Sequence, residues 1–245
     1  MDEMLSIHEL QKNFGDVIAV DNVSFDVVSG ECLGVVGPNG AGKTTTILCA
    51  LGLTSPTLGE IHIDGVNVHQ HRRRALRNVG FMAGYAPLNM NITVRRLLKH
   101  FAILASVKDP DTHVDRAIEL LQIPHLEKRL APRLSSGQKT LVNVARAIVH
   151  KPKLLVLDEP TAFTDPQVSL RVNDVIRKVK EEGTAILLTS HDMVEVERVC
   201  DRIIFIAQGS IRANVEIAHI EKEFGHDDLE KIWLEIAATE KKEEL

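Results

Sequence analysis

A glycine-rich loop followed by a lysine and two threonines has the clearest chemistry in this chain. Residues 37–45 read GPNGAGKTT and fit the pattern GxxxxGK[ST] in full. The glycines let backbone N–H groups turn toward phosphate oxygens, and the helix N-terminus after them adds partial positive charge. We therefore predict a triphosphate site in which Lys43 reaches the β- and γ-phosphates and the Thr44 hydroxyl binds Mg²⁺. Its expected lining is Gly37, Pro38, Asn39, Gly40, Ala41, Gly42, Lys43, Thr44 and Thr45.

Two adjacent acids end the apolar run LLVLDEP at residues 154–160. Asp158 is placed to hold Mg²⁺ through water, and Glu159 to orient and polarise an attacking water. His191 follows the apolar run AILLTS, and the carboxyl ends of parallel strands converge on one ligand-binding edge. An acidic strand end or a single histidine is more often structural. Together with the loop above, however, the pattern favours Lys43, Glu159 and His191 as catalytic residues.

A second stretch, LSSGQ at residues 134–138, also has the composition of an anion site. Two hydroxyl residues, a glycine and a glutamine directly precede a run with a strong apolar stripe. The N-terminus of a helix that begins in this way suits an anion. One chain would then contain two anion sites that are far apart in the sequence.

Short apolar runs flank a middle section of helical periodicity, and these elements must position the residues above. We expect strands at 17–28, 32–36, 59–65, 154–158, 185–190 and 203–209, and helices at 43–53 and 167–183. Residues 94–150 show a helical pattern throughout. The sequence therefore predicts an α/β fold with a parallel-sheet core and a helical insertion.

Composition excludes several classes of function. The 245 residues have a net charge of −5 and 4% aromatic residues, which argues against a nucleic-acid partner. The one basic cluster, HQHRRR at 69–74, is better explained as a solvated helix start than as a lipid or nucleic-acid surface. Cys32, Cys49 and Cys200 are isolated from one another in the sequence, so we expect neither a disulfide framework nor a zinc site. No apolar run reaches the ~20 residues of a membrane-spanning helix.

Taken together and in order, these motifs resemble those of the ATP-binding cassette ATPases. The match runs from about Leu5 to Gly209 and includes Asp165 in TAFTDP and His191 in TSHD. The resemblance implies a P-loop NTPase with a RecA-like parallel-sheet core, an antiparallel β subdomain and an inserted helical signature subdomain. It implies a nucleotide-binding domain at 1–220 with its helical subdomain at about 85–150, followed by a C-terminal helix and tail at 221–245. It also implies ATP and Mg²⁺.

The resemblance explains the second anion site. Members of this family form head-to-tail dimers in which each ATP lies between the P-loop of one copy and the signature helix of the other. By this resemblance, Ser135, Gly137 and Gln138 serve the nucleotide of the partner, and Asp165 contacts the other copy. Phe14 in KNFG matches the aromatic residue that stacks on adenine, although a core position is an equal alternative from the sequence.

The chain departs from the family pattern at two positions. Ser136 stands where glycine is most common, and we expect this small residue to be tolerated. Gly84 stands where the family has a glutamine that binds Mg²⁺, in a loop joining the core to the helical subdomain. A glycine offers no side-chain oxygen and makes a loop more mobile. We therefore expect slower hydrolysis, or hydrolysis that depends more on the partner, than in relatives with the glutamine.

A single cassette without a membrane span suggests a separately encoded subunit that binds an integral membrane permease. Its second partner would be another copy of itself or a paralogous cassette, and its location would be cytoplasmic, on the inner face of the cell membrane. The stretch DDLEKIWLEIA at 227–237 resembles the C-terminal helix of ABC-2 type exporters of drugs, lipids, polysaccharides or sodium. A plain capping helix is the alternative for this segment.

Two other functions stay open from the sequence. A degenerate cassette would bind ATP as a regulatory switch without turnover, which Gly84 favours and the intact Lys43, Asp158, Glu159 and His191 disfavour. A cassette protein that acts on ribosomes or DNA usually has two cassettes or long coiled-coil arms, and this sequence shows neither. The favoured prediction is ATP hydrolysis coupled to transmembrane transport, in the direction of export.

Overall fold

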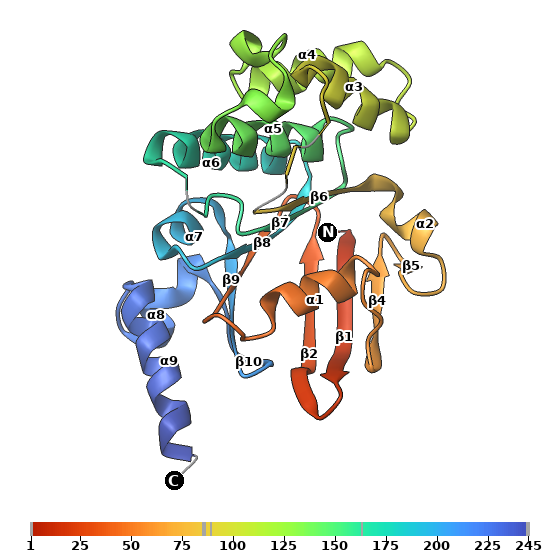
Figure 1. Ribbon diagram of the computed structural model, residues 1–245. Helices are drawn as coiled ribbons and strands as arrows, with labels where there is room; N and C mark the ends of the chain where they lie inside the picture. The colour runs from red at the N-terminus through yellow and green to blue at the C-terminus, as the bar shows by residue number, and fades with distance from the viewer. Residues whose placement is uncertain (1, 85–86, 89, 163, 244–245) are drawn as a thin grey trace.

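The computed structural model describes residues 2–84, 87–88, 90–162 and 164–243, and it contains two sheets (Figure 1). The smaller sheet is antiparallel, with strand order β2-β1-β4-β5. Its strands are β1 (Glu3–Phe14), β2 (Val17–Val28), β4 (Leu58–Ile63) and β5 (Val66–Asn67). The long strand β1 pairs with both β2 and β4, so it forms the centre of this sheet.

The larger sheet has six strands in the order β10-β9-β3-β8-β7-β6. They are β3 (Cys32–Val36), β6 (Val79–Ala83), β7 (Leu154–Asp158), β8 (Ala185–Ser190), β9 (Arg202–Ala207) and β10 (Ser210–Glu216). All neighbours pair in parallel except β10, which runs antiparallel to β9. Parallel pairing brings the ends of β3, β7 and β8 to one edge, where Val36 lies opposite Ser190 and Asp158 opposite Thr189.

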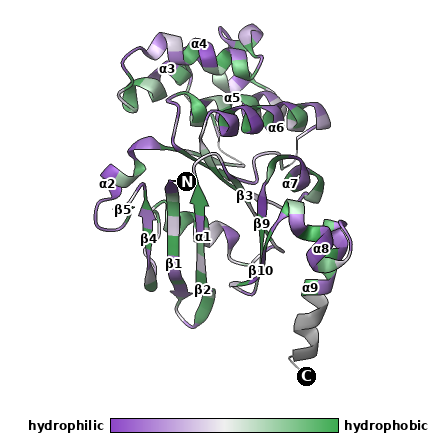
Figure 2. Ribbon diagram, turned by 180° about the vertical axis from the view of Figure 1, so that it is seen from behind, coloured by the Kyte–Doolittle hydropathy of each residue, from purple (hydrophilic) through white to green (hydrophobic). Residues whose placement is uncertain are grey.

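Nine α-helices are found in the described residues, with short 3₁₀ turns between some of them. They are α1 (Lys43–Ala50), α2 (Arg72–Ala75), α3 (Val94–Leu104), α4 (Pro110–Leu120), α5 (Ser136–Ile148), α6 (Pro166–Glu181), α7 (Met193–Val199), α8 (Ile220–Phe224) and α9 (Leu229–Glu243). In both views α5 and α6 lie side by side next to the large sheet, and α3 and α4 lie beyond them (Figures 1 and 2). Hydrophilic and hydrophobic residues alternate along α3 to α6, as in amphipathic helices (Figure 2).

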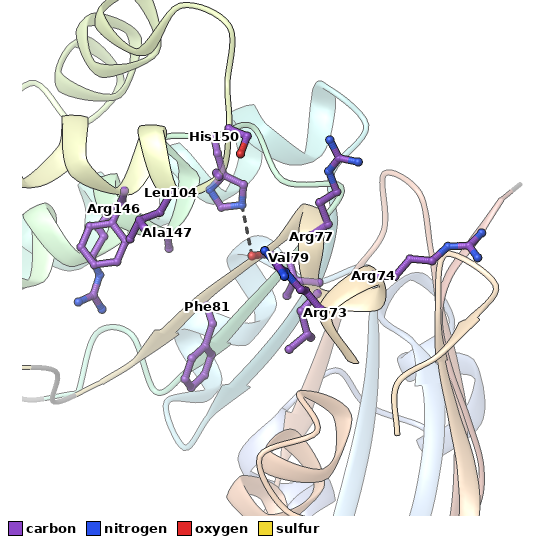
Figure 3. A pocket seen from close by; sticks show the side chains of 13 residues that line it. Arg73, Arg74, Arg77, Val79, Phe81, Leu104, Arg146, Ala147 and His150 are labelled. Atoms are coloured by element: carbon purple, nitrogen blue, oxygen red, sulfur yellow. Dashed lines mark hydrogen bonds between the residues drawn. The ribbon is translucent and has the colours of Figure 1, made fainter. Parts of the chain in front are cut away.

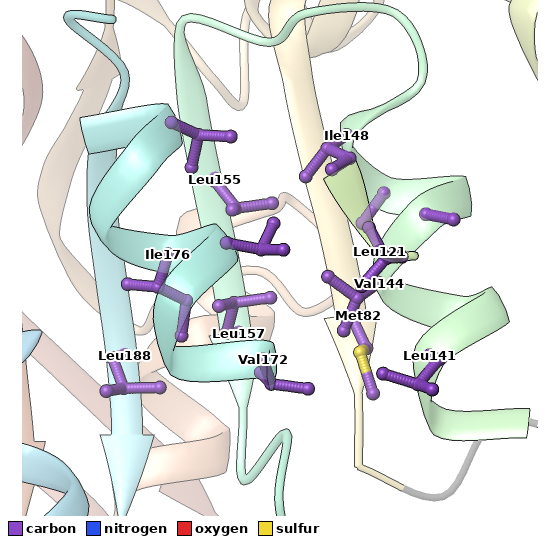
Figure 4. Packing of buried hydrophobic residues seen from close by; sticks show 14 of the residues in the cluster. Met82, Leu121, Leu141, Val144, Ile148, Leu155, Leu157, Val172, Ile176 and Leu188 are labelled. Carbon is purple, nitrogen blue, oxygen red and sulfur yellow. The ribbon is translucent and has the colours of Figure 1, made fainter. Parts of the chain in front are cut away.

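Aliphatic side chains join α5 and α6 to the sheet (Figure 4). Leu141 and Val144 of α5 lie near Met82 of β6, and Val172 and Ile176 of α6 lie against β7 and β8. These side chains are at most 3% exposed. Because such a close-packed core transmits displacement, α5 is mechanically connected to the strand ends that form the site.

The fold class predicted from the sequence is confirmed, including the parallel core, the antiparallel sheet and the inserted helices. At the C-terminus, Leu229 and Ile232 are buried, and the ring of Trp233 stacks on Phe205 of β9 with centroids 6.1 Å apart. The start of α9 thus shares the main core, while the domain boundary after residue 220 stays a prediction. None of the described helices has the length and apolar content needed to cross a bilayer.

Candidate active site

The glycine-rich loop lies between β3 and α1, as its pattern predicts. Gly42 has φ 101°, and a Cβ there would lie 2.5 Å from the carbonyl oxygen of Ala19, so a side chain cannot be accommodated without a shift. Lys43 is only 6% exposed, and its Nζ donates to the carbonyl oxygens of Gly37 at 2.7 Å and Pro38 at 3.0 Å. The lysine therefore lies directly against the loop that is expected to hold phosphate. Pro38, Asn39, Gly40 and Thr44 are exposed, Gly42 and Thr45 are half-buried, and Gly37 and Ala41 are buried.

Burial lowers the pKa of Lys43, and the negative charges of Glu159 and Asp158 act in the opposite direction. The electrostatic interaction shows that the two acids lie close enough to influence the lysine. A cation held near two carboxylates forms a site of mixed charge. Such a site suits an anionic ligand that arrives with its own divalent cation.

Thr44 and Asp158 come together from α1 and β7. Thr44 Oγ1 donates to Asp158 Oδ2 at 3.2 Å, and Thr189 Oγ1 donates to Asp158 Oδ1 at 2.6 Å. A hydroxyl and a carboxylate are hard oxygen donors of the kind that Mg²⁺ prefers. The pair therefore fits the Mg²⁺ site expected from the sequence, and a bound ion would neutralise developing charge on the phosphates.

Glu159 has a backbone conformation that is uncommon for a residue with a side chain. Its φ is 51°, which costs on the order of 1–3 kcal/mol for a non-glycine residue. Its N–H donates to the carbonyl oxygen of Thr189 at 3.0 Å and lies 3.1 Å from Thr189 Oγ1. These bonds hold the residue in place, and Glu159 Oε2 lies 3.4 Å from His191 Nδ1. The structure thus brings two of the three predicted catalytic residues together, and it adds Thr189, which the sequence analysis missed.

The signature stretch forms the start of α5. Ser135 caps the helix by accepting from the N–H of Gln138 at 3.3 Å, and Gln138 Oε1 accepts from the N–H of Ser135 at 3.2 Å. The Gln138 side chain therefore serves its own helix, in addition to any contact with a ligand. A Cβ on the buried Gly137 would lie 3.2 Å from Asp165 Oδ2, which places the signature beside the Asp165 that caps α6.

Several of the predicted site residues line three cavities of the chain. Ser135, Gly137, Gln138 and Asp165 line a cavity of about 190 Å³. Glu159 and His191 line another of about 510 Å³. Thr44, Asp158 and Glu159 also line a third of about 690 Å³, to which α5 contributes Ser136 and Lys139. The exposed Ser136 begins α5 without interrupting it, so the helix accommodates the first departure from the family pattern.

Gly84 lies directly after β6, which is the position expected for the missing glutamine. A Cβ at Gly84 would lie 2.4 Å from the carbonyl oxygen of Glu159 and 3.1 Å from that of Asp158. The backbone at this glycine therefore packs on the backbone of the catalytic acids. At residue 84 itself the glycine thus permits close packing, while the expected mobility of the loop stays a prediction. Residues 85, 86 and 89 of this loop lie outside the described residues.

Phe14 ends β1 with 53% of its surface exposed, so the alternative of a core residue is wrong. Lys12 Nζ lies 4.8 Å from its ring centroid, and Val17 and Ile18 beside it are 66% and 52% exposed. An exposed aromatic ring with exposed aliphatic neighbours can support a flat aromatic ligand. The adenine role stays a prediction.

A groove of about 940 Å³ lies between α2, β6, α3 and α5, away from these residues (Figure 3). Arg73, Arg74 and Arg77 contribute charge, and Phe81 and Leu104 contribute apolar surface. On the α5 side, the Arg146 guanidinium lies 5.2 Å from the ring centroid of Phe101. His150 at the end of this side bonds the carbonyl oxygen of Val79 through Nε2 at 3.2 Å (Figure 3).

Comparison with known proteins identifies the family. The model of the family described as ABC transporter matches residues 20–162, more than half of the chain. Nod factor export ATP-binding protein I of Burkholderia lata is 38% identical over 229 residues, which cover 92% of this chain and 75% of that protein. The protein of the same name from Rhizobium meliloti is 34% identical, over 84% of this chain and 62% of its own length.

Solved structures show the same fold. An ATP-binding subunit of an ABC transporter superposes with a TM-score of 0.86 at 24% identity, covering 96% of this chain and 99% of that chain. A dimeric ATP-binding cassette in a post-hydrolysis state, bound to ADP and Pi, superposes with a TM-score of 0.77 at 21% identity, covering 87% and 98%. The chain therefore belongs to the ABC transporter family, as an ATP-binding subunit with ATPase activity.

Proposed function

We propose that this ATPase subunit drives export through a separate membrane permease, and that two copies share a pair of ATP sites. One observation carries the proposal of shared sites. Lys43, Glu159 and His191 belong to one cluster, whereas Ser135 and Gly137 line a different cavity with Asp165. Among the described residues, the cavity lined by Ser135 and Gly137 contains no residue of the phosphate-binding loop, whereas Ser136 of the same helix start also lines the cavity of Thr44 and Asp158. A second copy would therefore supply the phosphate that Ser135 and Gly137 are suited to bind.

In the proposed reaction, backbone N–H groups of residues 37–45 and Nζ of Lys43 bind the phosphates. Thr44 and Asp158 would hold Mg²⁺. Glu159 accepts a hydrogen bond from a water molecule, whose oxygen attacks the γ-phosphorus in line while the bond to the β,γ-bridging oxygen breaks. His191 contacts the γ-phosphate and fixes this geometry. The products are ADP and phosphate.

In the proposed dimer, the start of α5 in the partner contacts the same γ-phosphate through Ser135 and Gly137. Charge attraction between the phosphate and the helix N-terminus favours the closed pair. Hydrolysis breaks the bond between the γ-phosphate, which α5 of the partner contacts, and the rest of the nucleotide, which residues 37–45 bind. The two copies then separate. Because α5 packs on β6, this motion displaces the groove beside β6 as well.

The arginine groove supports binding to a membrane partner. No acidic residue lines it in the described part of the chain. Several arginines outside the groove form ion pairs, among them Arg95, Arg116, Arg177 and Arg202. Burial lowers the pKa of Arg146, which a nearby negative charge would offset. We infer that an acidic segment of the permease with apolar residues binds here, on the inner face of the cell membrane. The names of the relatives support export.

One experiment tests both the shared ATP sites and the binding of a permease at the arginine groove. Tagged Glu159→Gln chain is purified with ATP and Mg²⁺ from a detergent extract of its own cells. We expect a dimer that carries a multi-span membrane protein. Adding Arg73→Glu and Arg77→Glu should keep the ATP-dependent dimer and lose the membrane protein. A monomer with ATP would contradict shared sites, and retention of the membrane protein after charge reversal would contradict the groove.

A wild-type chain that releases phosphate as slowly as Glu159→Gln would favour the switch without turnover.

A further inference from the structure

A buried carboxylate lies between two segments of the active site. Glu195 in α7 is 3% exposed, although it follows the exposed His191 by only four residues. Thr161 Oγ1 donates to Glu195 Oε1, and Ser190 Oγ donates to Glu195 Oε2, both at 2.7 Å. A buried carboxylate requires polar partners, and here each oxygen has one. The side chain thus joins the segment after Glu159 to the end of β8.

Each joined segment leads directly to a predicted site residue. The carbonyl oxygen of Thr161 accepts from Thr164 Oγ1 at 2.7 Å, and Thr164 precedes Asp165, which caps α6. On the other side, Ser190 immediately precedes His191, and Ser190 Oγ accepts from the N–H of Asp192 at 3.0 Å. A displacement of either segment therefore reaches the other through one carboxylate.

The neighbouring bonds complete this connection. Thr189, one residue before Ser190, bonds both the Asp158 carboxylate and the N–H of Glu159. The last two residues of β8 thus contact the catalytic strand end on one side and Glu195 on the other. Burial raises the pKa of Glu195, and the two hydroxyl donors act against this rise. An apolar side chain would be less costly to bury at this position. We therefore attribute the presence of a glutamate to its oxygens, which accept the two hydrogen bonds.

We propose that Glu195 is a positioning residue for ATP hydrolysis, which holds the segment carrying Glu159 and Asp165 in register with the strand end carrying His191. Contact of the partner copy with Asp165 is thereby transmitted to the Glu159–His191 pair. This inference rests on the shared sites proposed above, and it adds the connection between dimer contact and catalytic geometry.

Kinetic constants of three variants test the proposal. Glu195→Ala removes both acceptors, and we expect kcat to fall about 100-fold, as for other small misplacements of catalytic groups, while KM for ATP stays near that of wild type. Glu195→Gln keeps the size and one acceptor oxygen, so kcat should lie between those of Glu195→Ala and wild type. Glu197→Ala, an exposed glutamate two residues further along α7, is the matched control and should leave kcat unchanged.

A double-mutant cycle separates positioning from a purely structural role. Combining Glu195→Ala with Thr161→Val should cost no more in kcat than Glu195→Ala alone, because both remove the same bond. Wild-type kcat in Glu195→Ala, or additive losses in the cycle, would overturn the proposal. Glu159→Gln with Glu195→Ala should still dimerise with ATP. If the ATP sites are not shared between two copies, the single variant Glu159→Gln should instead stay monomeric with ATP.

Discussion

At Gly84 the chain has backbone contact where the family pattern led us to expect a side-chain ligand. The 2.4 Å approach of a hypothetical Cβ to the Glu159 carbonyl oxygen means that any side chain must move the catalytic segment. The lost glutamine oxygen and the close packing are therefore two separate effects of one residue. A substitution by glutamine alone cannot distinguish them, because it restores the ligand and also disturbs the packing.

We predict that Gly84→Ala lowers kcat by roughly 10- to 100-fold, because the methyl group displaces Glu159. Gly84→Gln should show the same loss at saturating Mg²⁺ and a smaller loss than alanine at limiting Mg²⁺, because its side-chain oxygen can bind the ion. The measurement is steady-state ATP hydrolysis against Mg²⁺ concentration. If Gly84→Ala and Gly84→Gln depend identically on Mg²⁺ concentration, the missing ligand has no role. If Gly84→Ala keeps the kcat of wild type, the close packing at residue 84 has no role.

The sequence predicted the residues whose types and spacing are diagnostic by themselves. Lys43, Thr44, Asp158, Glu159 and His191 lie together because each lies at or after the end of a parallel strand of one sheet. Thr189 and Glu195 could not be found in this way. Their roles depend on the register of β7 against β8 and on a contact between Thr161 and Glu195, which are 34 positions apart. Hydroxyl and carboxylate residues are too common for such a pairing to be inferred without the fold.

Among the elements, α5 has the signature at its beginning and the groove at its end. Its first residues form the Ser135 cap, and Arg146 and His150 at and after its end line the groove. Ligand contacts at one end can therefore displace partner contacts at the other through a single helix of 13 residues. His150 attaches this end to Val79 of β6.

His150 provides a pH test of this attachment. Burial lowers the pKa of His150 below its ordinary value of 6.5, the charge of His113 acts in the same direction, and the bond to Val79 acts against both. The unfolded chain therefore takes up a proton before the folded chain does, so stability falls as pH drops below about 6.5. We predict that His150→Gln reduces the loss of unfolding free energy between pH 7 and pH 5, as measured by urea unfolding.

The control for this test is His125→Gln, at an exposed position. It should follow the wild-type pH dependence. An equal fall in stability for wild type and His150→Gln would contradict the interpretation. Part of the decrease in unfolding free energy should persist in His150→Gln, because burial also lowers the pKa of His69.

Strands that are continuous apolar runs in the sequence were predicted with accurate bounds. The apolar runs at 32–36, 154–158 and 185–190 became β3, β7 and β8 with the expected bounds. The central strand of the small sheet, β1, was not predicted. Its pairing with β2 contains several register shifts, and Glu9 within it has φ 48°, so its buried and exposed residues do not alternate regularly. Irregular pairing of this kind removes the period-two signal on which sequence analysis depends.

At the scale of the whole molecule, the topology brings distant residues together in ways that spacing does not reveal. Cys32 at the start of β3 and Cys200 after α7 were considered isolated, yet their buried sulfurs lie 3.8 Å apart. The two anion-binding stretches behave in the opposite way. They were predicted to act in one type of site, and within the chain Ser135, Gly137 and Gln138 line a different cavity from Thr44 and Asp158. The account of function therefore depends on two copies.

Mixing two inactive variants tests this central claim most directly. Lys43→Ala removes the phosphate cation. Ser135→Asp keeps a good helix cap but places a negative charge where the γ-phosphate of the partner is expected, and Ser135→Asn keeps the cap without the charge. We predict that each of the first two variants is inactive alone and that Ser135→Asn is active. A mixture of Lys43→Ala and Ser135→Asp should hydrolyse ATP, because the mixed dimer contains one intact site. A mixture that stays inactive although mixed dimers form, or an active Ser135→Asp chain at a rate independent of its concentration, would contradict the account.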